Sequence, residues 1–155
     1  MLVVGPQVPV RTVPDFVAWA KRQPAGVNYA SWGVGSSSQV RALQLAQAIG
    51  VPMNHVPYCG NPDAIQSLLA DEIPMMFSGL VAAAPHHKAG KLRMLAFTGT
   101  ERSPFFPDIP TFKEVGLPTI VAADQNLHQF GRPEHACSSP SVFFRRSSLT
   151  RLLRA

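Results

Sequence analysis

The 155-residue chain has few charged residues, only two cysteines and no long apolar run. Charged residues make up 15% of the chain and hydrophobic residues 46%, which excludes wholesale disorder and leaves enough apolar material for a core. Cys59 and Cys137 are too few and too isolated for a disulfide framework or a cysteine-rich metal site. No run approaches the ~18 apolar residues of a membrane-spanning helix. Residues after Met1 lack the basic and apolar regions of a signal peptide, so we expect no export signal in this chain.

The net charge of +5 is unevenly distributed along the chain. Residues 1–121 carry nine basic and seven acidic side chains, whereas residues 122–155 carry five and two. The longer segment is therefore close to neutral and lacks the basic face of a nucleic-acid-binding domain. We expect no nucleic-acid partner. An arginine-rich tail that binds nucleic acid or a membrane surface is the alternative, and such binding would fall steeply with salt.

Short apolar runs alternate with helical patterns through the first 120 residues. Strands are predicted at 2–4, 27–30, 53–56, 73–77 and 92–97. Helices are predicted after capping boxes at Thr12–Asp15 and Thr111–Glu114, before Gly50, after an N-cap at Asn61, and over 78–89. This alternation predicts an α/β fold with a mostly parallel sheet and helices on both of its faces. Beyond about Val121 neither periodicity is sustained.

A loop rich in glycine and serine joins the strand at 27–30 to the following helix. In an α/β sheet such a loop lies beyond the carboxyl end of its strand, where ligands bind. Free N–H groups at the helix start, with hydroxyls beside them, favour a carboxylate or a phosphate. The candidate ligand-binding residues in this loop are Ser31, Gly33, Gly35, Ser36, Ser37 and Ser38. An ordinary tight turn with a serine N-cap is the alternative.

The loop does not fit the standard nucleotide-binding motifs. Ser38 stands where a dinucleotide fingerprint requires glycine or alanine, and no Gly-Lys-Ser/Thr sequence follows. Tyr58 follows the next strand and could point into the same crevice, although a tyrosine packed under a turn is an equal alternative.

Catalytic and metal-binding residues are sparse. Cys59 has no base close to it in sequence, and His55, four residues earlier in a strand, is expected to point away from the loop. His86 and His87 project about 100° apart on a helix, and no zinc-like spacing occurs. We therefore expect no catalytic residue, no metal and no cofactor. An α/β enzyme that acts on a small anionic substrate is the alternative, and it requires Tyr58, His55 or Cys59 to meet near Ser36.

The chain resembles the Bug family of periplasmic solute-binding proteins, the receptors of tripartite tricarboxylate transporters. The matching stretches keep their order and spacing over about residues 1–118. They include Asn28-Tyr29-Ala30-Ser31 with Gly33, Gly35 and Ser36-Ser37-Ser38, then His55-Val56-Pro57-Tyr58 with Gly60, Lys88-Ala89-Gly90-Lys91-Leu92-Arg93, and Pro107-Asp108-Ile109-Pro110-Thr111.

This resemblance implies one lobe of a two-domain, type-II-like periplasmic binding fold that closes on a small carboxylated solute. Such receptors pass the solute to a membrane permease, perform no reaction and work in the periplasm. The stretch Ser31–Ser38 matches the second domain's contribution to the cleft, and Tyr58 and Gly60 match a neighbouring loop.

The chain also departs from the family it resembles. Members are about twice as long, and their first domain supplies the other half of the cleft. We therefore expect residues 1–118 to form an incomplete second lobe that alone binds its ligand weakly or not at all. Residues 119–155 are expected to be an irregular tail, unlike the family and similar to translation in another reading frame.

Overall fold

Five strands form one mixed sheet within residues 1–120, the part of the chain that the computed structural model describes. They are β1 (Leu2–Val4), β2 (Val27–Ser31), β3 (Met53–Pro57), β4 (Met75–Phe77) and β5 (Arg93–Ala96), in the spatial order β3-β2-β4-β1-β5. β2 pairs in parallel with both β3 and β4, whereas β1 pairs antiparallel with β4 and β5. Four strands thus share one direction, and β1 runs against them.

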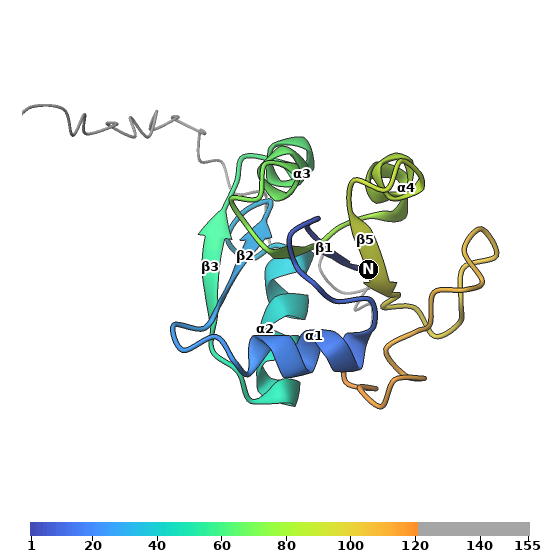
Figure 1. Cartoon of the computed structure of the whole chain (residues 1–155), viewed down its shortest axis with the longest axis horizontal. Helices are drawn as coiled ribbons and strands as arrows, with labels where there is room; N and C mark the ends of the chain where they lie inside the picture. Colours follow the sequence, from blue (N-terminus) through green and yellow to red (C-terminus); the bar gives the residue numbers. More distant parts are fainter. Residues whose placement is uncertain (121–155) are drawn as a thin grey trace, which may run out of the picture.

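Four helices cover both faces of the sheet, as predicted (Figure 1). α1 (Val13–Ala20) and α2 (Ser37–Ile49) pack on one face, against side chains that include Tyr29 and Phe77. α3 (Asn61–Leu69) and α4 (Leu80–Lys88) pack on the other face, around Ala30 and Met76. Alternate residues of β2 and β4 therefore enter different cores, as the two-residue period of a strand requires. None of these four helices combines the length and the apolar character needed to cross a membrane.

The predicted start of α1 and end of α2 are confirmed. The Thr12 hydroxyl accepts a hydrogen bond from Asp15 N, and the Asp15 carboxylate accepts one from Thr12 N, each at 3.2 Å. This reciprocal capping box contributes about 1 kcal/mol to the start of α1. α2 ends at Gly50, which adopts the left-handed conformation expected of a helix C-cap.

Two predicted helix starts are wrong. Gly60, not Asn61, is the N-cap of α3, because the Asn61 side chain instead accepts a hydrogen bond from the Ser78 hydroxyl at 3.2 Å. The helix predicted over 78–89 begins only at Leu80, after its N-cap Gly79.

The capping box at Thr111 forms, but no helix follows it. Glu114 accepts hydrogen bonds from Thr111 N at 2.7 Å and from the Arg102 side chain at 3.0 Å. Residues 112–116 form turns. Gly116 and Pro118 limit the segment to a few residues, which is too short to offset the free-energy cost of helix nucleation.

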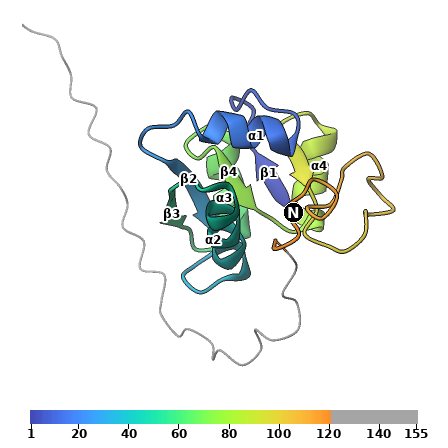
Figure 2. The same ribbon diagram turned by 90° about the horizontal axis from the view of Figure 1, so that it is seen from below.

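Residues 97–120 extend from the β5 side of the sheet (Figure 2). Phe97 forms a parallel bridge with Thr111, and Phe112 and Ile120 return to the core beside α1 and α2. The irregular tail predicted over 119–155 lies, beyond residue 120, outside the described residues.

Replacement of Phe77 tests whether the core between the sheet and α2 stabilises this fold. Phe77 is fully buried and its ring centroid lies 6.0 Å from that of Phe112. We expect Phe77→Ala to lower the free energy of unfolding by about 3–5 kcal/mol in urea titrations. Phe77→Leu should cost less, because it leaves a smaller cavity.

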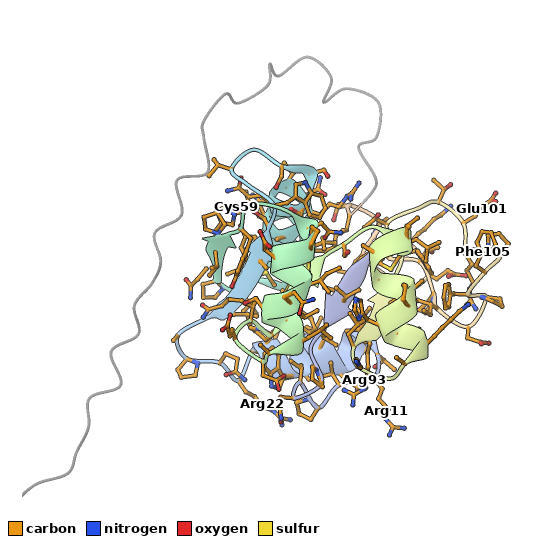
Figure 3. The ribbon with its side chains drawn as sticks, turned by 90° about the horizontal axis from the view of Figure 1, so that it is seen from above. Arg11, Arg22, Cys59, Arg93, Glu101 and Phe105 are labelled. Carbon is orange, nitrogen blue, oxygen red and sulfur yellow. The ribbon has the colours of Figure 1, made fainter. Side chains whose placement is uncertain are left out.

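Phe105→Ala is the matched control, because Phe105 is 77% exposed and lies at the periphery in Figure 3. We expect its effect to stay within about 0.5 kcal/mol. Equal losses for the two alanine variants would contradict the assigned core.

Candidate functional site

The connections that leave β2 and β4 diverge at one edge of the sheet. These two strands are neighbours, but β2 leads into α2 on one face and β4 leads into α4 on the other. Such a topological switch point is where open α/β sheets bind ligands, beyond the carboxyl ends of their strands. Figure 3 shows Cys59, which follows β3, at this edge, whereas Arg22 lies at the opposite end of the strands.

The predicted loop 31–38 lies at this switch point. Gly33 has a φ angle of +133° and Gly35 one of +77°, a region that residues with a side chain rarely adopt. A Cβ atom added to either glycine would meet no other group within 4 Å. The glycines are therefore required for the path of the backbone, and the space beside them is open.

The loop presents the start of α2 to this open space. The Ser36 hydroxyl donates to Gly33 O at 2.7 Å and accepts from Gln39 N at 3.4 Å, and Val40 N donates to Ser36 O at 3.1 Å. Among the described residues, Ser37 N has no hydrogen-bond acceptor. A free N–H at the positive end of a helix dipole can donate a hydrogen bond to an anion, and the partly exposed hydroxyls of Ser36 and Ser37 lie beside it.

Two of the predicted loop residues lie below the protein surface. Ser31 and Ser38 are completely buried, so they lie beneath the loop and not on its surface. The Ser38 hydroxyl lies 2.9 Å from that of Ser36 and supports the N-cap from inside. Ligand binding by these residues stays a prediction, and the most accessible candidates are Gly33, Gly35, Ser36 and Ser37.

Two further helix starts share this edge of the sheet. Gly60 and Gly79 are the N-caps of α3 and α4, and neither has a side chain that could satisfy the first backbone N–H groups. The buried Ser78 hydroxyl donates to Asn61 Oδ1 and joins these two helix starts. Gly60 is one of the predicted site residues, whereas the segment after β4 is not among them, although its position after a predicted strand was the signal available.

His55 does not point away from the loop, so this prediction is wrong. Its Nε2 lies 2.5 Å from the Ser31 hydroxyl, and its Nδ1 lies 3.3 Å from Gln39 Nε2. The parallel register pairs His55 with Tyr29, whose ring it stacks on at a centroid distance of 5.2 Å. His55 therefore occupies the face covered by α2, whose first turn carries Gln39.

The aromatic pair is sheltered from water. Burial lowers the pKa of the His55 imidazole below its ordinary value of 6.5. Burial also raises the pKa of the Tyr29 hydroxyl above 10, and a hydrogen bond with Gln39 offsets part of that rise. Both shifts favour the uncharged forms of the two rings.

Tyr58 faces α3 and not Ser36. Its hydroxyl lies 2.5 Å from that of Ser67, which donates to the Glu72 carboxylate at 2.6 Å. Of the groups that the enzyme alternative could bring to Ser36, Tyr58 is held by Ser67 of α3, whereas His55 contacts Ser31 and Gln39 beneath the loop. Within residues 1–120, no group of three histidine, cysteine or acidic side chains could hold a metal ion.

An apolar groove of about 470 Å³ lies at the other end of α2. Its walls come from α1, from the end of α2 and from residues 115–117, and they include Val17, Ile49 and Leu117. Lys21 is the single charged residue that lines the groove. The loop 31–38 precedes the start of α2, so the groove at the end of that helix is separate from the candidate anion site.

The family model described as the tripartite tricarboxylate transporter family receptor matches residues 1–126. Among curated proteins, the UPF0065 protein in the gbd 5′ region of Cupriavidus necator is 37% identical over 126 residues, which are 81% of this chain and 38% of that protein. BugT of Bordetella pertussis is 29% identical over 79% of this chain and 38% of its own length. The chain thus spans about two fifths of the length of the curated relatives it matches.

Solved structures show the same relationship. MatC from Rhodopseudomonas palustris with bound malate has a TM-score of 0.73 and 30% identity, over 78% of this chain and 41% of that one. Rpa4515 of the same species, with adipate, has a TM-score of 0.73 and 29% identity, over 76% and 40%. These likenesses confirm the predicted α/β lobe of a periplasmic binding protein.

The titration of His55 tests its sheltered position. We expect ¹H–¹⁵N NMR of the imidazole to give a pKa below 6.5. Because the unfolded chain then binds the proton more readily, His55 should contribute stability above pH 6.5 that is lost as the pH falls through the folded-state pKa. A pKa at or above 6.5 would contradict the contacts with Ser31 and Gln39.

Proposed function

Because this chain belongs to the tripartite tricarboxylate transporter receptor family, we propose that it forms one lobe of a receptor for a small carboxylated solute. The observation that carries this proposal is the open start of α2 at the switch point between β2 and β4. The family consists of receptors, not of enzymes, and the proposed role involves no reaction and no cofactor.

In this proposal, one carboxylate of the solute lies against the loop 31–38. Ser37 N–H donates to it, and the partly exposed Ser37 hydroxyl lies beside that N–H, whereas the hydrogen of the Ser36 hydroxyl stays on Gly33 O. Gly33 and Gly35 allow the close approach, because no side chain projects from them into the open space. Ser31 and Ser38 support the loop from below, and Gly60 at the start of α3 flanks it together with Tyr58.

The solute class follows from the chemistry of this edge. Helix N–H groups and hydroxyls suit a compact anion such as a carboxylate. Two structural neighbours hold malate and adipate, which are both dicarboxylates. We propose a dicarboxylate whose second carboxylate is held by residues outside this lobe.

The proposed role has a partner and a location. A receptor of a tripartite transporter delivers its solute to a membrane permease, and the family binds its solutes in the periplasm. We propose both for the protein to which this lobe belongs. The proposal requires no nucleic acid, which agrees with the near-neutral charge of residues 1–121.

Ser37→Asp separates ligand binding from helix stability. An acidic residue in the first turn of α2 favours the helix dipole, so the free energy of unfolding should stay unchanged or rise slightly. The same carboxylate occupies the anion position and repels a ligand. Malate added to the wild-type chain should shift the Ser37 amide resonance at high concentration, and the Ser37→Asp variant should lose this response.

Ala25→Asp is the matched control, because Ala25 is exposed and precedes β2 at the opposite edge of the sheet. It adds the same charge and should leave the malate response intact. The uncharged diamide of malate should cause no shift in any variant. The proposal is wrong if malate leaves the loop resonances of the wild-type chain unchanged, and micromolar affinity would contradict the expectation that one lobe alone binds weakly.

A further inference from the structure

The Gln39 side chain joins the loop 31–38 to β3. Its Oε1 accepts a hydrogen bond from Gly35 N at 2.6 Å, and its Nε2 lies 3.3 Å from His55 Nδ1. Because the oxygen is used by an N–H donor, the amide group can only present its NH₂ to the imidazole. His55 Nδ1 is therefore an acceptor, and the hydrogen of the neutral ring is on Nε2.

His55 continues this connection to the other end of the loop. With its hydrogen on Nε2, the ring donates to the hydroxyl of the fully buried Ser31. That hydroxyl donates to Gly33 O at 3.0 Å and accepts from Gly33 N at 3.2 Å. One continuous chain of hydrogen bonds thus runs from Gly35 through Gln39, His55 and Ser31 to Gly33.

These hydrogen bonds reach the two glycines of the loop, Gly33 and Gly35, whose φ angles are positive. Neither glycine has a neighbouring group within 4 Å of its Cβ position, so side-chain packing from that direction does not hold the loop. The hydrogen bonds to Ser31, His55 and Gln39 restrain the loop, together with the bond from the Ser36 hydroxyl to Gly33 O. His55 stacks on the buried Tyr29, and this contact attaches the series of hydrogen bonds to β2.

We propose that Gln39 and His55 are positioning residues that hold the loop 31–38 in the shape that presents Ser37 N–H to a carboxylate. They act through Gly35 and Ser31 and do not touch the ligand. The effect on ligand binding rests on the proposed function, whereas the effect of Gln39 and His55 on the conformation of the loop does not depend on it.

The test compares three variants of the full chain with the wild type and with a control. Gln39→Ala removes both bonds of the amide, and Gln39→Glu keeps an acceptor for Gly35 N–H but removes the donor to His55. His55→Phe keeps a ring that can stack on Tyr29 and removes both hydrogen bonds of the imidazole. Gln47→Ala is the matched control, because Gln47 is an exposed glutamine on the same helix.

Amide hydrogen exchange measures how well the backbone N–H groups of the loop are protected. We expect Gln39→Ala to raise the exchange rate of the Gly35 amide about tenfold, as the loss of one hydrogen bond implies. Gln39→Glu should restore most of the Gly35 protection, and His55→Phe should accelerate exchange at Gly33. Gln47→Ala should change neither amide, and the unfolding midpoint in urea should show that every variant is folded.

The malate response of Ser37 is the second measurement. In Gln39→Ala and His55→Phe the shift of this amide at a given malate concentration should fall severalfold. Unchanged exchange at Gly33 and Gly35 would overturn the inference, and so would a full malate response in variants with a loosened loop. If the wild-type chain shows no malate response while the variants exchange faster, the proposed function fails and the role of Gln39 and His55 in holding the loop stands.

Discussion

The parallel pairing of β2 with both β3 and β4 is the constraint on which the rest of this lobe depends. It places the carboxyl ends of three strands at one edge, so that the loops after them meet there. The helices that follow β2 and β4 lie on opposite faces, because the chain moves from β2 to β3 on one side and from β4 to β5 on the other, and their connections therefore separate. The loop 31–38 lies where these connections separate.

The same pairing sets the position of His55. The β2–β3 register places His55 beside Tyr29, so the ring lies on the face where the first turn of α2 carries Gln39. From there the imidazole reaches Ser31 at the end of β2. A contact between residues far apart in sequence thus helps to hold the loop 31–38, and the strand register makes that contact possible.

Much of this architecture could be predicted from the sequence, because the signals for it are local. The capping box at Thr12, the serine N-cap of α2 and Gly50 at its end are each read from a few adjacent residues. The alternation of strands and helices predicted the α/β lobe and the place of the loop 31–38. The resemblance to the Bug family, which the family match now confirms, added the receptor role.

The errors arose where a distant residue decided the outcome. Asn61 has the composition of an N-cap, but the hydroxyl of Ser78 binds its side chain and Gly60 takes that position. His55 was placed by strand alternation alone, which cannot show which residue of another strand or helix it meets. Likewise Ser31 and Ser38 look like surface hydroxyls in a glycine-rich loop, and only the fold buries them.

The central claim is that the start of α2 receives one carboxylate of the solute, and a crystal structure of this chain grown with malate tests it most directly. We predict density for a carboxylate within hydrogen-bond distance of Ser37 N and the Ser37 hydroxyl, with the bonds of Gln39 and His55 intact. Malate bound only at another surface, such as the apolar groove beside Ile49, with the loop 31–38 empty, would contradict the account.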